Sequence, residues 1–273
     1  MRLTSSSSIS RQQKPTCESL LFLFPAFSPA AETINAGSVD FTIGSSTAAA
    51  SSMAGDAPIK IFAYQNSIPT GEGIIARGDS AIQNIRDLVG KKVAVNRDGT
   101  GEYLLAKALE KEGVPLDQVE RVYLGPADAG PAFAQGKVDA WAVWGSFLAT
   151  AETEYKDRVI ASGGDIGSKD DIIYVVRTEF LEQYPDVVKA VYEVLKQQSE
   201  SASNNPKQAL VAYGKTFKLS PSVVNVLSQR IEKPLASIDA AELSRISTVV
   251  DWFFQKGLIP KKPDVANFVV DIK

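Results

Sequence analysis

The stretch Asn35-Ala-Gly-Ser-Val-Asp-Phe41 has a counterpart 99 residues further along the chain, Ala134-Gln-Gly-Lys-Val-Asp-Ala140. Each copy ends a helical pattern with a glycine and opens a strand pattern with Val-Asp. The glycine supplies the left-handed residue that ends a helix, and the valine begins a buried strand. Gly-x-Val-Asp is a common turn between a helix and a strand, but the shared flanking patterns favour two related lobes.

Helix and strand patterns alternate around both copies, which is typical of βαβ units and a mostly parallel sheet. The expected strands are 39–44, 59–65, 92–96, 119–124 and 138–143, and the expected helices are 29–36, 48–54 and 102–112, with another ending at Gln135. Beyond Ile172 the pattern becomes helical, at 178–199, from Ser220-Pro221 and at 239–256. In the last helix, we expect a capping box followed by a core stripe: Asp239 and Glu242, then Leu243, Ile246, Val250, Phe253 and Phe254.

Composition restricts the classes of function. The chain has 273 residues, of which 44% are hydrophobic, enough for one large core or two ordinary lobes. Its net charge is -3 and its basic residues form no stripe, so we expect no nucleic-acid partner. No apolar run approaches the roughly 20 residues of a membrane-spanning helix, so we expect no integral membrane protein.

The chain has no histidine, and its one cysteine is Cys17. These counts exclude Ser/His/Asp and Cys/His catalysis, imidazole metal ligands and an internal disulfide. Acid and base chemistry would rest on carboxylates, Lys or Tyr, which is uncommon for a hydrolase. We therefore expect a binding protein with no catalytic residue, no metal and no cofactor.

Residues 1–19 are rich in Ser, Gln and Lys and lack periodicity, so they are expected to form a disordered leader. The apolar run from Leu20 to Phe27 follows Arg2, Arg11 and Lys14, as in a signal peptide with a short apolar segment. Glu18 interrupts the basic region, so the chain carries no convincing signal peptide.

Three loops follow expected strands, and ligands of open α/β sheets bind outside the carboxyl ends of the strands. Two of them are Gly44-Ser-Ser-Thr47 and Trp144-Gly-Ser146, one after each repeated strand. The third, Asn96-Arg-Asp-Gly-Thr-Gly-Glu-Tyr103, offers glycines and a helix N-terminus as an anion seat, with Thr100 as the expected N-cap.

An ordered series of segments carries a resemblance from about Phe24 to the C-terminus. The segments are Glu32–Phe41, Asp87-Leu-Val-Gly-Lys-Lys-Val-Ala-Val-Asn96, Glu102-Tyr-Leu-Leu105, Pro126-Ala-Asp-Ala129 and Val138-Asp-Ala-Trp-Ala-Val-Trp144. In these the chain resembles the solute-binding proteins of bacterial ABC importers for sulfonates, taurine and nitrate. The resemblance implies a monomeric periplasmic or cell-envelope protein that holds a small anionic solute, most simply an organosulfonate, and delivers it to a membrane permease.

The fold implied is the two-lobed periplasmic binding protein type II fold, with mixed, mostly parallel sheets covered by helices. Two crossover strands, near Gly73 to Arg77 and Ile172 to Arg177, would join the lobes. Residues 20–76 and 174–273 would then form the first lobe, and residues 77–173 the second. Such proteins begin with a strand and helix that are not recognisable here, and Leu20 to Phe24 is a candidate replacement for the second strand.

Carried over residue by residue, the resemblance implies a ligand site lined from both lobes. Its expected members are Ser45, Ser46, Thr47, Asn96, Thr100, Gly101, Tyr103, Trp141, Trp144 and Ser146, with Gln65 as an extra donor. The two tryptophans are three residues apart on a strand, so we expect one in the core and place Trp144 in the cleft.

Glu102 has two interpretations: a solvated carboxylate in the first turn of its helix, or a partner for the cationic end of a zwitterionic solute. The function also has alternatives on the same fold. These are an enzyme of precursor biosynthesis, the ligand-sensing domain of a regulator, and a truncated family member that binds nothing. Fold alone does not separate them.

Overall fold

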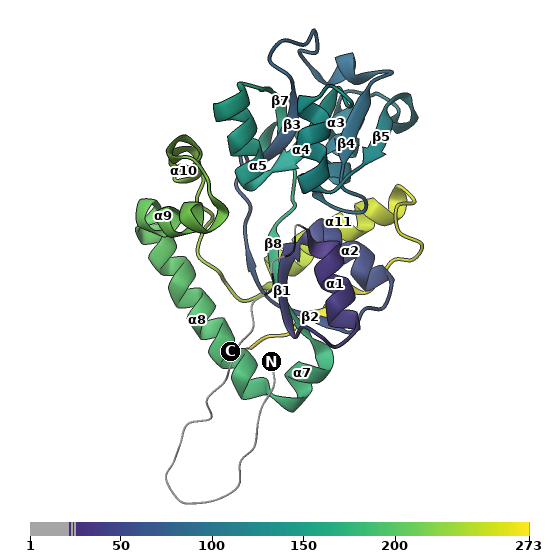
Figure 1. The fold of residues 1–273 in the computed structure, drawn as a ribbon. Helices are drawn as coiled ribbons and strands as arrows, with labels where there is room; N and C mark the ends of the chain where they lie inside the picture. The colour runs from purple at the N-terminus through teal and green to yellow at the C-terminus, as the bar shows by residue number, and fades with distance from the viewer. Residues whose placement is uncertain (1–21, 23, 25, 273) are drawn as a thin grey trace, which may run out of the picture.

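The computed structural model describes residues 26–272 and, ahead of them, Phe22 and Phe24. The expected leader and most of the candidate strand from Leu20 to Phe24 lie outside these residues, and Phe22 and Phe24 are in no strand. The described chain forms two lobes, each built on its own sheet (Figure 1). None of the described helices is long and apolar enough to cross a membrane.

The first lobe has a three-stranded sheet in the order β1, β8, β2, which are Phe41–Ser45, Ile172–Arg177 and Ile59–Gln65. Its sheet is covered by α1 (Phe27–Asn35), α2 (Ser46–Ala54), α7 (Thr178–Gln183) and α11 (Ala240–Gln255). The long helix α8 (Pro185–Asn204) leads from this lobe to α9 (Pro206–Phe217) and α10 (Pro221–Leu227) beside the other lobe (Figure 1).

The second lobe has a five-stranded sheet in the order β5, β4, β6, β3, β7. These strands are Glu120–Tyr123, Lys92–Val95, Ala140–Trp144, Glu72–Ala76 and Arg158–Ser162. Its helices are α3 (Thr100–Lys111), α4 (Pro126–Ala134), α5 (Gly145–Thr150), which runs into a π-helical turn at Ala151–Tyr155, and α6 (Gly163–Ile166). Short 3-10 turns lie at Ile85–Leu88, Leu116–Gln118 and Val265–Phe268.

Strand direction confirms mixed sheets, although antiparallel pairings outnumber the parallel ones. Strands β1 and β2 both run antiparallel to β8, and β4, β5, β6 and β7 share one direction against β3. Each sheet therefore holds one reversed strand, and that strand is the one that enters from the other lobe. These two strands, β3 and β8, contain the expected crossovers. The division into lobes by residue number remains our proposal. It places β3 in the first lobe, whereas β3 pairs inside the sheet of the second lobe.

The repeat is longer than the heptapeptide. Helix α1 and strand β1 reappear as α4 and β6, with each of their bounds 99 residues further along the chain. Gly37 and Gly136 have φ of 70° and 69°, the left-handed conformation expected after a helix. The repeated strands begin at Phe41 and Ala140, two residues later than expected.

Helix α11 packs its apolar face into the core of the first lobe. Ile246, Val250 and Phe253 are fully buried there, but Phe254 is 44% exposed, so its expected core position is wrong. A step of one residue turns a helix by about 100°, which carries Phe254 off the buried face. Asp239 caps the helix by accepting from the Glu242 N–H at 2.7 Å. The Glu242 carboxylate instead contacts Asn66 and Arg245, so the second half of the expected capping box is not formed.

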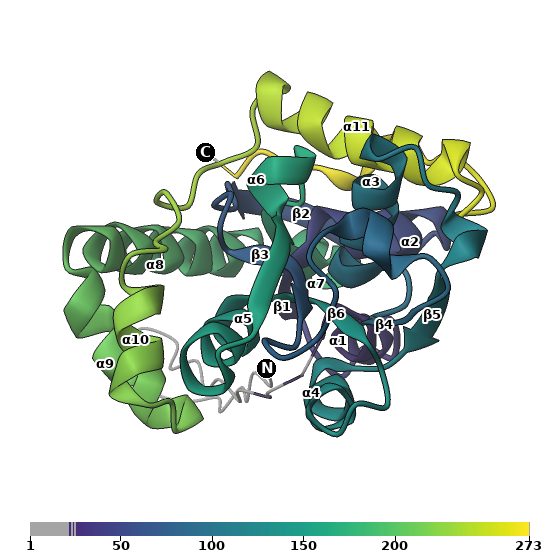
Figure 2. The same cartoon turned by 90° about the horizontal axis from the view of Figure 1, so that it is seen from above.

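The lobes touch on two sides (Figure 2). On one side Tyr103 of α3 packs edge-on against Trp252 and stacks on Phe253, with ring centroids 5.0 Å and 5.9 Å apart. On the other side α10 packs against α5, and Arg230 makes a two-pronged ion pair with Glu152 at 2.7 and 2.9 Å. The two lobes are therefore in contact through α3 and α11 and through α5 and α10.

Adjacent aromatic residues in α11 give a matched test of this packing. Phe253→Ala should lower the free energy of unfolding by about 3–5 kcal/mol, because it opens a cavity in the first lobe and removes the stack on Tyr103. Phe254→Ala, the control at the neighbouring exposed position, should cost less than about 1 kcal/mol. Urea unfolding followed by circular dichroism measures both, and equal losses would contradict the burial pattern.

Candidate functional site

The loops that follow β1 and β4 meet between the lobes. Ser45 ends β1, and its hydroxyl caps α2 by accepting from the Ala48 N–H at 3.4 Å. Ser46 and Thr47 form the first turn of α2 and are buried. Thr100 begins α3 in the opposite lobe, and its hydroxyl lies 3.3 Å from that of Ser45. The predicted loops of the two lobes are thus in direct contact.

One buried carboxylate, that of Asp170, lies at the centre of this contact. Its Oδ1 accepts from the Thr47 N–H at 3.0 Å and the Ser46 hydroxyl at 3.2 Å. Its Oδ2 accepts from the hydroxyls of Thr47 at 2.9 Å and Thr100 at 2.6 Å. The three residues together form what we call the anion seat: Ser46 and Thr47 from the first lobe, and Thr100 from the second.

The two neighbouring aspartates, Asp170 and Asp171, have different partners. Asp171 pairs with Arg245 of α11, whose Nε donates to Oδ2 at 2.7 Å, and it also accepts from the Ser67 N–H at 2.9 Å. Within the described part of the chain no lysine or arginine pairs with Asp170. Its charge is met only by neutral donors of the anion seat.

A second buried acid, Glu72, stands at the start of β3 close to Asp170. Burial, reinforced by the negative charge of Asp170, raises the pKa of Glu72 to about 8. Burial also raises the pKa of Asp170, against the hydrogen bonds from Thr100, Thr47 and Ser46 that lower it. Donors stabilise the charged form of an acid, and the anion seat gives Asp170 four of them. We therefore assign the negative charge to Asp170 and the proton to Glu72 at neutral pH.

The loop after β4 differs from the expected anion seat in two respects. The N-cap of α3 is Gly99, and Thr100 is the first helical residue, so its expected capping role is wrong. The Asn96 Oδ1 accepts from the Gly101 N–H at 2.7 Å, which occupies one of the free N–H groups of the helix. A Cβ on Gly101 would lie 2.7 Å from that oxygen and 3.1 Å from the Ala142 carbonyl oxygen, so the site requires glycine. Asn96 and Gly101 therefore shape the loop.

The solvated interpretation of Glu102 is wrong. The side chain is buried, and its Oε1 accepts from the Arg121 guanidinium and the Tyr123 hydroxyl, each at 2.7 Å. Its Oε2 accepts from the Asp98 N–H at 2.9 Å. Glu102 thus fixes the loop that precedes α3, and its contact with a zwitterionic solute stays a prediction.

Two other expected donors serve as structural contacts. The buried Tyr103 hydroxyl accepts from the Lys169 N–H at 3.4 Å, and desolvation raises its pKa. Gln65 donates to the Lys233 carbonyl at 3.0 Å and accepts from the Tyr174 hydroxyl, all within the first lobe. Tyr103 borders the anion seat through the segment that carries Asp170, whereas the hydrogen bonds of Gln65 lead to Lys233 and Tyr174.

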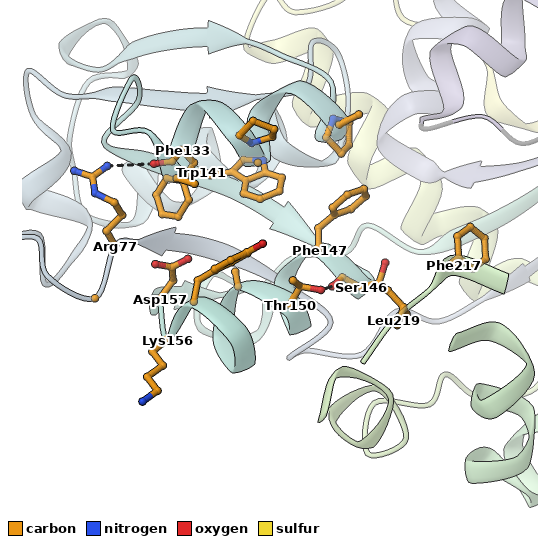
Figure 3. Close-up of a pocket in the computed structure, with 18 of the residues that line it drawn as sticks. Arg77, Phe133, Trp141, Ser146, Phe147, Thr150, Lys156, Asp157, Phe217 and Leu219 are labelled. Carbon is orange, nitrogen blue, oxygen red and sulfur yellow. Dashed lines mark hydrogen bonds between the residues drawn. The ribbon is translucent and has the colours of Figure 1, made fainter. Parts of the chain in front are cut away.

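The remaining expected residues face a different part of the molecule. Trp141 and Ser146 line a pocket of about 980 Å³ between α4, α5 and the turn that joins α9 to α10 (Figure 3). Trp141 lies 6.2 Å from Phe133 and 6.0 Å from Phe147, ring centre to ring centre. Trp144, at the end of β6, is half-buried and lies outside the residues that line this pocket. We keep Trp144 in the cleft as a proposal.

The arginine that lines this pocket is already engaged. The Arg77 guanidinium donates to the carbonyl oxygens of Val138 and Phe133, at 3.0 and 3.4 Å, and lies 5.9 Å from the centre of the Phe133 ring. Tyr155 and Phe147 add exposed aromatic surface. Among the described residues no group of three or more histidine, cysteine or acidic side chains is arranged to hold a metal ion.

The sequence reasoning missed Asp170 and Glu72, the two acids at the centre of the lobe contact. The signal available was Asp170-Asp171, a pair of acids directly before an apolar crossover strand. Acids at the entry to a buried strand need partners, and the hydroxyl-rich loop Ser45–Thr47 was already predicted to lie at that end of the sheet.

A family model described as "NMT1/THI5 like" matches residues 23–209. The chain belongs to this family. Among its relatives is a protein of Escherichia coli strain K12 named "putative aliphatic sulfonates-binding protein". It is 27% identical over 243 residues, which cover 89% of this chain and 76% of the relative.

Solved structures support the assignment of this NMT1/THI5-like chain. The alkanesulfonate-binding protein SsuA of Xanthomonas axonopodis pv. citri, bound to MOPS, superposes with a TM-score of 0.85 and 25% identity, covering 91% of this chain and 86% of the other. A desulfurization enzyme, DSZB, superposes with a TM-score of 0.66 at 15% identity, covering 85% of this chain and 82% of the other, which shows the fold alone. The periplasmic binding protein fold expected from the sequence is confirmed.

Glu72 predicts how the stability of the NMT1/THI5-like protein depends on pH. Its pKa is about 8 in the folded state and 4.5 ordinarily, so the folded protein holds a proton that the unfolded chain releases between these values. The free energy of unfolding should therefore fall as pH rises from about 5 to 8. Glu72→Gln carries no such proton, and we expect it to reduce that fall by about 2 kcal/mol or more.

Urea unfolding at pH 5 and pH 8 measures the difference. Glu182→Gln, at an exposed position on α7, is the matched control and should change with pH as the unmodified protein does. If the Glu72→Gln variant loses as much stability between pH 5 and pH 8 as the unmodified protein does, the protonated state assigned to Glu72 is contradicted.

Proposed function

We propose that this chain binds a small oxyanionic solute at the anion seat between its lobes and delivers it to an ABC importer. The observation that carries the proposal is the convergence of four donors, from both lobes, on one carboxylate. Donors so placed suit the oxygens of an external anion, because charge-assisted hydrogen bonds are among the stronger polar contacts. Because the donors come from two lobes, a bound anion would contact both of them.

Sulfonates are the solute class that we favour. The names of the Escherichia coli relative and of the Xanthomonas structure both refer to sulfonates. A sulfonate presents three oxygens, and the anion seat offers the N–H and hydroxyl of Thr47 with the hydroxyls of Ser46 and Thr100. The aromatic pocket of the second lobe has its arginine engaged by carbonyl oxygens, so it is the less suitable place for the charged group.

The proposal is a binding protein and not an enzyme. The relatives named above are binding proteins, and the likeness to DSZB is a likeness of fold. A membrane permease of the ABC type would be the partner, and a cell-envelope or periplasmic location would follow from that role. We propose a monomer, because two lobes of one chain already supply both walls of the anion seat.

Thermal stability gives the first test of the proposal. Taurine, ethanesulfonate, MOPS, nitrate and sulfate are each added to the full chain, and the melting temperature is followed against concentration. A ligand at 100 times its Kd stabilises the native state by about 2.7 kcal/mol, which should raise the melting temperature by roughly 5–10 °C. Saturating shifts with the sulfonates would support the proposal, and no shift with any of the five would contradict it.

The position of the bound sulfonate is tested separately by amide chemical shifts. Titration should move the resonances of Thr47 and Thr100 in the anion seat. The amides of Gly130 and Ala151, which line the aromatic pocket, serve as the internal control and should stay in place. Shifts confined to the control amides would place the solute in the second lobe instead.

A further inference from the structure

The anion seat is filled by a side chain of the protein itself. All four of its donors point at Asp170, which lies in the segment between α6 and β8 as the chain returns to the first lobe. The contact joins Thr47 of one lobe to Thr100 of the other through a single carboxylate. A carboxylate presents two oxygens where a sulfonate presents three, so it imitates the group that the seat is built to hold.

The carboxylate and an anionic solute exclude each other from the seat. Two like charges in contact repel each other strongly where burial keeps water from screening them. The same donors are also unable to serve both groups, because each hydroxyl has one proton to donate. Among the described residues no arginine or lysine pairs with Asp170 to offset the second charge.

We propose that Asp170 is an internal competitor for the anion seat, which a sulfonate must displace to bind, and that it sets the affinity of this chain for anionic solutes. The inference rests on the proposed function in assigning the solute to this seat. Asp170 also holds the lobes together before solute arrives, so displacement and rearrangement of the hinge segment occur in one step.

The neighbouring groups fit this role. Glu72 of β3 and Tyr103 of α3 face Asp170 from the second lobe, and Asp171 lies beside it with its own charge paired to Arg245. Arg245 pairs with Asp171, so of the two aspartates only Asp170 depends on the donors of the anion seat that a solute would use. Release of Asp170 breaks its hydrogen bonds to the anion seat, and the solute then forms hydrogen bonds with the same donors.

Affinity measurements by isothermal titration test the competition. With the carboxylate removed, Asp170→Gly should bind taurine, ethanesulfonate and MOPS at least about 10-fold more tightly than the unmodified chain, because one hydrogen bond to a charged group is worth about 1.5–3 kcal/mol. Asp170→Asn keeps the size of the side chain and removes its charge. Its affinity should lie between those of the unmodified chain and Asp170→Gly. Asp165→Asn, in the exposed cap of α6 five residues earlier, is the matched control and should bind as the unmodified chain does.

A second substitution gives competition a distinctive signature. In the unmodified chain Thr100→Val weakens both the solute and its competitor, so the affinity for ethanesulfonate should change less than about 3-fold. In the Asp170→Gly background no competitor remains, and the same substitution should weaken binding about 10-fold. Equal effects in the two backgrounds would overturn the proposal. The proposal would also be overturned if the unmodified chain bound taurine, but not ethanesulfonate, more tightly than Asp170→Gly does. Asp170 would then contact the ammonium group of taurine.

Amide hydrogen exchange of the solute-free protein separates this inference from the proposed function. The Thr47 N–H donates to Asp170, so its exchange should be slow in the unmodified chain and in Asp165→Asn and at least about 10-fold faster in Asp170→Gly. If exchange follows this pattern but no variant binds a sulfonate, Asp170 still occupies the anion seat and sulfonate is rejected as the solute. Equally fast exchange of Thr47 in all three proteins would overturn the internal competitor.

Discussion

A single carboxylate, with no cationic partner among the residues that the structure describes, organises the contact between the two lobes. Removing Asp170 from water is costly, and only the hydroxyls and N–H of Ser46, Thr47 and Thr100 offset that cost. Those donors come from α2 and α3, so both helices must start at this point. The buried Glu102 in turn fixes the loop before α3 through Arg121 and Tyr123. The arrangement of hinge, helix starts and loops follows from satisfying one buried charge.

Local patterns in the sequence were sufficient for most of the fold. The glycines at 37 and 136 end their helices in the left-handed conformation, and β2 spans the expected residues 59–65. The crossovers were expected in the correct strands because the family resemblance implies two of them, and β3 and β8 lie there. The missed elements include β7 and α9. Phe254 was assigned to the core because it is hydrophobic. The turn of about 100° between neighbouring helix residues carries it off the buried face.

The candidate site was harder to predict, because function here depends on long-range pairing. Ser46, Thr47 and Thr100 were identified from their positions after strands, and the structure brings them together. Whether Glu102 is free or paired depends on Arg121, which lies 19 residues away, and no local pattern reports such a pair. Asp170 is 123 residues from Thr47 in the chain, so its role as occupant of the seat emerges only from the folded structure.

The most direct test of this account is a crystal structure of the full chain with a bound alkanesulfonate at high resolution. The account predicts the sulfur atom between α2 and α3, with sulfonate oxygens within hydrogen-bond distance of the Thr47 N–H and the Thr100 hydroxyl. It also predicts that the Asp170 carboxylate has left both groups. A sulfonate found elsewhere, with Asp170 still bonded to Thr47 and Thr100, would contradict it.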